Sequence, residues 1–174
     1  HEIIDRYSSF NNDSAMYYAS LGTRIARGDS ALPFRLRGTA LKPLAGFYES
    51  AMKEFATFDS LSIPPEYKAD YYDAGRQMYS FVYGLFPSYH KFNDSIGRQL
   101  LQMQLRLLDK LPEGSVARHF STGEYYMLTG EYDKAKAYCL ELMYGSDSTA
   151  AYKARLAHHL ATIARHEGND DERT

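Results

Sequence analysis

A short turn that occurs twice in this chain constrains its fold more than any other feature. The stretches Gly46–Ala51 (Gly-Phe-Tyr-Glu-Ser-Ala) and Gly130–Ala135 (Gly-Glu-Tyr-Asp-Lys-Ala) share the pattern Gly-x-Tyr-x-x-Ala. Glycine ends a helix readily because it adopts a left-handed backbone conformation without a steric penalty. We expect the tyrosine to fill the gap between two paired helices and the alanine to let the second helix approach the first closely. The turn therefore predicts helical hairpins that repeat along the chain.

The rest of the sequence also favours helices. It has no alternating runs of Val, Ile and Thr and no Asn-Gly hairpin, so strand signals are almost absent. From Ile96 to Leu111 the apolar residues fall on one broad helical face. Glycines and prolines divide the chain into helix-sized pieces. We therefore expect helices near residues 13–27, 33–45, 47–60, 66–86, 89–111, 115–129, 132–144 and 149–167.

Pro43 conflicts with the helix expected over residues 33–45. Inside a helix a proline costs about 3 kcal/mol, because it lacks the N–H that the helix needs. Two alternatives stay open: the helix kinks at Pro43, or it ends early, before Gly46.

The later hairpin carries further residues of a known repeat. Gly123 and Tyr126 lie where tetratricopeptide repeats carry a small residue and an aromatic residue in their first helix. Leu142 falls where the second helix packs forward. The chain thus resembles the tetratricopeptide-repeat superfamily. The resemblance implies an all-α fold, namely a right-handed α-α superhelix of about four degenerate helix pairs, in a single domain over residues 1–174.

The repeats that we expect are degenerate. Turn-like signals recur at Gly46, near Pro87, at Gly130 and at Gly168, with separations of 38–43 residues. A regular tetratricopeptide repeat has roughly 34 residues. The helix at 13–27 and the unit around Pro87 also depart from the Gly-x-Tyr-x-x-Ala pattern.

The order of segments resembles one bacterial family more closely. It is the N-terminal helical-repeat region of membrane-anchored transcription regulators that carry a C-terminal domain of unknown function. The stretches that carry the resemblance are Tyr7–Ala19, Phe55–Leu61 leading into Ile63–Glu66, and Ala69–Ala74. The resemblance implies that the repeats lie outside the inner membrane, in the periplasm, and that one span and a coiled coil lead to a cytoplasmic DNA-binding end. It supplies no catalytic residues.

The composition fits a folded module and argues against some partners. Because 44% of the residues are hydrophobic and 16 are Tyr, we expect a real core, with most aromatic rings in the core or in helix seams. The net charge of −2 is spread along the chain without a polybasic block, which argues against nucleic acid binding through this segment. Apolar stretches such as Phe81–Phe86 are far shorter than the roughly 18 residues of a membrane span. The chain begins at His1 without Met, so we expect a fragment whose membrane contact lies in missing parts of the parent.

A search for catalytic chemistry gives no strong candidate. Cys139 is the one cysteine, which excludes an intramolecular disulfide and a cysteine-rich zinc site. His158 and His166 share a helix face but lack the spacing of three or four residues that helical metal sites use. Asp70 and Asp73 are more simply a solvated helix edge than an acid–base pair. We therefore expect neither an enzyme nor a metal ion or other cofactor.

A binding groove is the site that the repeat resemblance implies, because the first helices of such repeats line the concave face. Counting back from Gly130 places apolar residues of the helix at 115–129 on this face. Counting back from Gly168 places basic residues of the helix at 149–167 on it. Such a groove would suit an acidic peptide or a carboxylate. A helix edge that the next hairpin normally covers is the competing interpretation. The predicted groove residues are Phe120, Glu124, Met127, Arg155, His158 and Arg165, with Thr162 and His166 on the same face of the last helix.

Five Asp-Ser triplets with a small, apolar or Thr third residue stand out, where composition predicts about one. They resemble an O-glycosylation motif that one group of bacteria uses on exported proteins. Asp and Ser also cap helices and form turns, and most of the triplets lie at expected helix ends. Both interpretations stay open. The triplets begin at Asp13, Asp29, Asp59, Asp94 and Asp147.

Three hypotheses follow for the function. The leading one is a non-catalytic sensor module that binds a peptide or protein partner on the periplasmic side and forms the input part of a membrane-anchored transcription regulator. The second is a lipoprotein that captures glycans or nutrients with the same repeats, and the third is a cytoplasmic scaffold. A small ligand or glycan, and a homodimer through exposed helices, remain open as partners.

Overall fold

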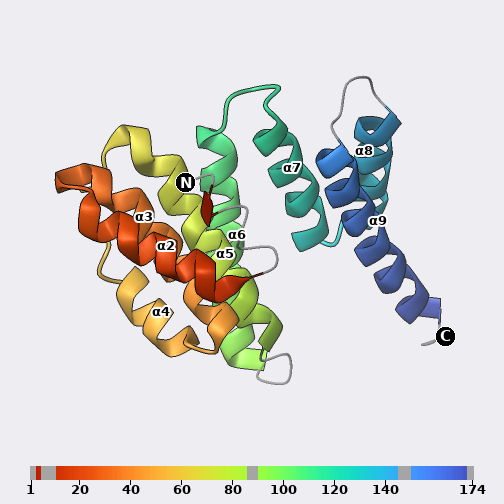
Figure 1. Cartoon of the computed structure of the whole chain (residues 1–174). Helices are drawn as coiled ribbons and strands as arrows, with labels where there is room; N and C mark the ends of the chain where they lie inside the picture. The colour runs from red at the N-terminus through yellow and green to blue at the C-terminus, as the bar shows by residue number, and fades with distance from the viewer. Residues whose placement is uncertain (1–2, 5–10, 86–89, 145–149, 172–174) are drawn as a thin grey trace. The chain divides into compact units, whose positions relative to one another are not determined.

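The computed structural model describes residues 3–4, 11–85, 90–144 and 150–171 (Figure 1). From residue 11 onward this described part contains eight α-helices and no β-strand, so the predicted all-α fold is confirmed. The chain divides into two compact units, His1–Lys110 and Leu111–Thr174. The single domain expected over 1–174 stays a prediction. The helices are α2 (Asn12–Ile25), α3 (Leu32–Leu41), α4 (Tyr48–Phe55), α5 (Lys68–Leu85), α6 (His90–Lys110), α7 (Val116–Leu128), α8 (Tyr132–Tyr144) and α9 (Ala150–Asp171), with 3-10 turns η1 (Gly28–Ala31), η2 (Lys42–Ala45) and η3 (Pro65–Tyr67).

The helix bounds agree with the sequence prediction to within two residues, except at the ends of three helices, α3, α4 and α9. The helix α4 ends at Phe55, well before residue 60, because the N–H groups of Thr57 and Phe58 bond to carbonyls three residues back, at 2.9 and 3.1 Å. The helix α9 runs through Gly168 to Asp171, so the turn predicted at Gly168 is wrong. A glycine inside a helix costs only about 1 kcal/mol relative to alanine, which is not enough to end a long helix.

Pro43 ends its α-helix early. The helix α3 stops at Leu41, and the chain continues as the 3-10 turn η2, with Pro43 at the start of that turn. The first N–H groups of a helical turn have no hydrogen-bond partner within it, so a proline at this position removes no hydrogen bond. The structure thus decides between the two alternatives, a kink and an early end, in favour of the early end.

The two Gly-x-Tyr-x-x-Ala turns have the same backbone structure. Gly46 and Gly130 are both left-handed, with φ of 83° and 74°. The residue after each glycine donates its N–H to the carbonyl five residues back, Phe47 to Lys42 at 3.0 Å and Glu131 to Tyr126 at 2.9 Å. The helix-terminating role predicted for glycine is confirmed, since this bond pattern satisfies the last carbonyls of the first helix.

The alanines and tyrosines of the two turns differ in burial. Ala51 and Ala135 are both fully buried, as a close approach of the paired helices requires. Tyr48, in contrast, is 38% exposed, and Tyr132 is half-buried. The alanine prediction is confirmed, whereas Tyr48 fills its gap less completely than expected.

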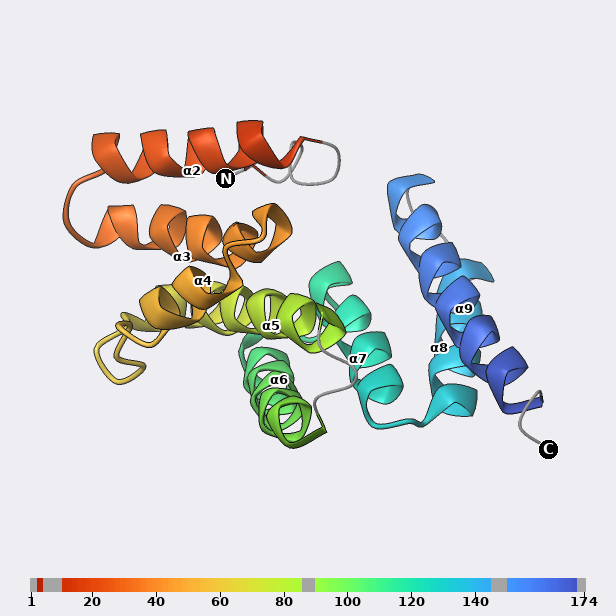
Figure 2. The same ribbon diagram turned by 90° about the horizontal axis from the view of Figure 1, so that it is seen from below.

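The first unit, residues 1–110, stacks its helices around an aromatic centre. Figure 2 shows α2, α3 and then α4 with α5 in successive layers, and α6 pairs along α5. The ring of Phe55 stacks on that of Tyr71, with 5.0 Å between centroids and 13° between planes. It also meets the rings of Phe58 and Tyr79 edge-on. A Cβ on Gly75 would come within 2.6 Å of the Phe55 ring, so only glycine allows this approach.

A charged cluster adds a link between α3 and α5 at the side of this core. The Asp73 carboxylate accepts hydrogen bonds from Arg37 of α3 at 3.2 Å, and from Arg76 and Gln77 of its own helix at 2.8 and 2.7 Å. Asp73 is therefore engaged in a structural ion cluster.

The second unit, residues 111–174, has a smaller core. The helices α7 and α8 form the hairpin around Gly130, and α9 packs against both. Phe120, Cys139 and Leu156, one from each helix, form the buried cluster. The buried ring of His159 meets Phe120 edge-on, with centroids 5.6 Å apart.

Candidate binding site

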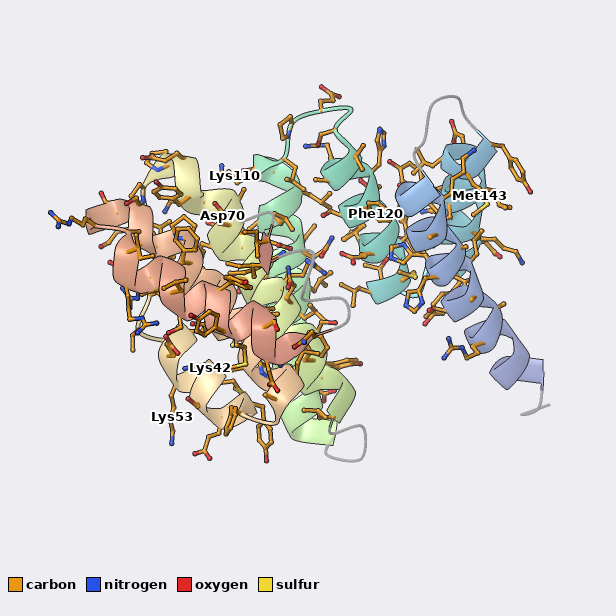
Figure 3. The ribbon with its side chains drawn as sticks, in the orientation of Figure 1. Lys42, Lys53, Asp70, Lys110, Phe120 and Met143 are labelled. Atoms are coloured by element: carbon orange, nitrogen blue, oxygen red, sulfur yellow. The ribbon has the colours of Figure 1, made fainter. Side chains whose placement is uncertain are left out.

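The predicted groove on the second unit is not assembled as one surface. On α7, where Figure 3 labels it, Phe120 is only 6% exposed, and its ring meets the buried ring of His159 edge-on. Glu124 and Met127, on the same helix, are half-buried. Phe120 is therefore a core residue and not a ligand-contacting one.

On α9 the two described groove candidates face away from that core. Leu156 and His159 point toward α7 and α8, whereas His158 and Arg165 are exposed. At 100° per residue, positions 158 and 165 lie roughly opposite position 156. The Arg155 side chain lies outside the described residues, as does that of His166, while Thr162 is half-buried with its hydroxyl bonded to the His158 carbonyl at 3.0 Å. The apolar half and the basic half of the predicted groove thus lie on different faces.

The first unit holds a groove that the sequence analysis did not predict. It has a volume of about 290 Å³ and lies between α2 and α4, with α3 and η2 as its floor. We call it the basic groove. Cationic side chains line it from three elements, namely Arg24 of α2, Arg35 of α3 and Lys42 of η2, together with Glu54 of α4. Met16, Ala19 and Phe34 supply its apolar walls.

The cations of the basic groove differ in their partners. Lys42 forms an ion pair with Glu54 across the groove, and both side chains are less than one third exposed. The guanidinium of Arg35 lies 5.0 Å from the centre of the Phe58 ring, a cation–π contact that fixes its position. No carboxylate of the described residues pairs with Arg24 or Arg35. Two arginines that line one groove are therefore available to an anion, as far as the described residues show.

A signal for this groove is present in the sequence. Arg35, Gly38, Thr39 and Lys42 have the spacing of i, i+3, i+4 and i+7, which puts them on one face of a helix. Neither the contribution of Arg24 from the preceding helix nor the position of α4 could be read from that pattern. The repeat resemblance directed attention to α7 and α9 instead.

A second cavity, of about 520 Å³, lies on the other side of α2. Ile4, Leu21, Ile25 and Phe34 give it an apolar lining. The Phe34 ring packs so tightly under Gly22 that a Cβ there would come within 2.1 Å of it.

The titratable groups of the described residues carry no sign of catalysis. Burial raises the pKa of the Cys139 thiol, and burial likewise raises the pKa of Tyr71 and of Tyr79. No group of three His, Cys, Asp or Glu side chains within the described ranges could hold a metal ion. Burial, which favours the neutral form, is the largest cause of the raised pKa of Cys139, Tyr71 and Tyr79, and the neighbouring Tyr79, Tyr72 and Asp59 raise the pKa of Tyr71 further.

The Asp-Ser triplets occupy several kinds of position. Asp59 closes a turn, since it accepts hydrogen bonds from the Leu61 N–H at 3.0 Å and the Ser62 hydroxyl at 2.6 Å. Asp94 and Ser95 are exposed inside α6, and the triplet at Asp147 lies outside the described residues. The turn-forming interpretation is thus confirmed for Asp59, and glycosylation stays a prediction.

None of the helices in the described ranges has the length and apolar character that crossing a membrane requires. Helical hairpins closed by Gly-x-Tyr-x-x-Ala turns define the class of this protein, a tetratricopeptide-type helical repeat. Within that class, the chain belongs to the family described as the SusR N-terminal TPR domain, whose model matches residues 1–174. Searches of curated proteins and of solved structures gave no match.

Proposed function

We propose that this chain is the periplasmic input module of a membrane-anchored transcription regulator. It binds a ligand or a protein partner without catalysis, and the bound state changes the arrangement of the attached span and output domain. The observation that carries the proposal is the match of the SusR N-terminal TPR domain model to all of residues 1–174.

The structure supports a binding role through its grooved first unit. The helices of this unit leave a groove with two available guanidinium groups and a second, apolar cavity. Tetratricopeptide-type repeats typically bind partners with such surfaces. A ligand shifts a regulator only if it binds one arrangement more tightly than the other, so the input module needs a site whose shape depends on that arrangement.

The compartment can be tested with a thiol label in the full-length parent. Cys139 is buried and its thiol pKa is raised, so we expect it to react slowly and a second cysteine at an exposed position to report its own surroundings. Lys53 is suitable, because its side chain is 75% exposed (Figure 3). Lys53→Cys should react in intact cells with a maleimide that does not cross the inner membrane. Labelling only after the cells are broken would contradict the periplasmic location and favour a cytoplasmic scaffold.

The regulatory role needs a separate test. Deletion of residues 1–174 from the parent should abolish the response of its target genes to the inducing nutrient, while a constitutive variant of the output domain should still activate them. If the response survived the deletion, the domain would not be the input module. A nutrient-capturing lipoprotein would instead show loss of nutrient binding at the cell surface and no DNA-binding end in the parent.

A further inference from the structure

We propose that the basic groove of the first unit binds a small organic anion, in which a carboxylate is attached to a short apolar body. The inference rests on the proposed binding function and adds the chemical class of a ligand.

The charge of the groove favours an anion. Arg24, Arg35 and Lys42 against the one carboxylate of Glu54 give its lining a net charge of +2, whereas the whole chain has a net charge of −2. A local positive region on a negative chain concentrates small anions and guides them to the groove. Lys42 is neutralised by Glu54, so Arg24 and Arg35 supply most of this attraction.

The hydrogen-bonding groups of the groove favour recognition by the guanidiniums. The hydroxyl groups of Thr23 and Thr39, which also line it, already donate to carbonyls of their own helices, at 2.9 Å each. The planar guanidinium presents two parallel N–H groups that match a carboxylate. Arg35 is already held over the Phe58 ring, so part of the entropy cost of fixing its side chain is met before a ligand binds.

The size and walls of the groove exclude an inorganic ion as the best ligand. A volume of about 290 Å³ is close to the lower limit of sites for small molecules. Met16, Ala19 and Phe34 offer apolar surface between the cations. An ion such as phosphate would leave these walls in contact with water, whereas a short acyl or aromatic body would cover them.

The test uses the 174-residue chain with hexanoate as the probe, followed by the backbone amide signals of Gly38 and Thr23. Hexanoate should shift these signals with a Kd on the order of 1 mM at low salt. Hexanol and hexylamine, of the same length without a negative charge, should bind at least tenfold more weakly, and so should inorganic phosphate. High salt should weaken the binding of hexanoate, because charge drives it.

Five variants separate the groove from a general effect of charge. Arg24→Gln and Arg35→Gln should each weaken hexanoate binding roughly tenfold, since each removes a charge-assisted hydrogen bond. Glu54→Gln should strengthen it about threefold, because Lys42 is then available. Lys53→Gln removes the same charge as the arginine variants, but on the exposed side of α4, and should leave the Kd unchanged. Arg24→Lys keeps the positive charge but lacks the planar guanidinium, so it should bind hexanoate somewhat more weakly than the unchanged protein.

Three results would overturn the inference. They are the absence of shifts at Gly38 and Thr23, equal binding of hexanol, and equal weakening by Lys53→Gln and Arg24→Gln. If the domain bound a protein partner or controlled its target genes while hexanoate left the groove unchanged, the inference would fail and the proposed function would stand. If hexanoate bound the groove and deletion of the domain left regulation intact, the proposed function would fail instead.

Discussion

The two compact units share one turn and differ in almost everything that the turn connects. Gly46 and Gly130 have the same left-handed backbone and the same pattern of hydrogen bonds. Before Gly46 the chain passes through a 3-10 turn with Pro43, and before Gly130 through a regular α-helix. The first unit then builds an aromatic core with a groove beside it, and the second builds a small core around one phenylalanine. The turn therefore fixes the hairpin, while residues outside it decide the core and the site.

Replacing the central aromatic residue of each unit should have the largest effect on this comparison. Phe55 contacts three aromatic rings, whereas among the described residues Phe120 meets the ring of His159. Phe55→Ala should lower the free energy of unfolding by about 4–5 kcal/mol and Phe120→Ala by about 3 kcal/mol, the upper and lower parts of the usual range for such changes. Hydrogen exchange measured at each amide would locate the loss in α3–α5 for the first variant and in α7–α9 for the second.

Leu61→Ala is a suitable control for both variants, because Leu61 is 90% exposed and its loss should leave stability nearly unchanged. An equal decrease in the free energy of unfolding for Phe55→Ala and Phe120→Ala would show that the additional ring contacts of Phe55 do not add to stability.

Replacing the glycine of each turn tests what the units share. Gly46→Ala and Gly130→Ala should each cost about 1–2 kcal/mol, because a left-handed backbone strains any residue with a Cβ. A Cβ at either position would meet no atom within 4 Å, so the cost comes from the backbone alone. Urea unfolding of both variants would measure it. Unequal costs that differ by more than 1 kcal/mol would mean that the two turns are not energetically equivalent.

Much of the fold could be predicted because its signals are local. The left-handed glycines, the buried Ala51 and Ala135, and the helix bounds all follow from turn chemistry and periodicity. The error at Gly168 has a physical cause too. A glycine signals a helix end only where the surrounding residues make the end favourable, and the last helix gains more by continuing. The position of Pro43 alone allowed either a kink or an early end, and the structure shows that α3 ends before it.

The site was harder to predict because it depends on contacts between helices. Phe120 looks like a groove residue from its repeat position, but the packing of α9 turns it into core. Arg24 and Arg35 line the same groove only because α2 and α3 pack side by side, and nothing in either helix alone marks them as a pair. A resemblance to a repeat family predicts where partners usually bind, and it cannot report which groove a degenerate repeat leaves open.

The thiol of Cys139 offers a probe of the second unit that the first unit lacks. Burial raises its pKa, so the neutral thiol persists above its usual titration range. Because the pKa of Cys139 is higher in the folded than in the unfolded protein, the neutral thiol contributes to the free energy of unfolding. That contribution is fully present below the unfolded pKa and is lost as the pH rises through the folded pKa. At pH 8 we expect labelling by a thiol reagent to be at least tenfold slower than in denaturant. Phe120→Ala should accelerate labelling, because it opens the cluster that covers Cys139. Fast labelling of the unchanged protein would contradict the burial.

The smallest expected effect concerns two ion pairs that α4 makes on opposite sides. Glu54 pairs with Lys42 where both side chains are about 30% exposed, and Glu49 pairs with Lys53 where both are about 75% exposed. Glu54→Gln should lower the free energy of unfolding by up to about 1 kcal/mol, while Glu49→Gln should cause no measurable change, because water and salt screen an exposed pair. The hydrogen bond from Lys53 lowers the pKa of Glu49, so any contribution of that pair would be present above the unfolded pKa and lost as the pH falls. Melting temperatures of both variants at low and high salt would show which ion pair contributes to stability. An equal decrease for the two would mean that the partly enclosed surroundings of Glu54 do not strengthen its pair.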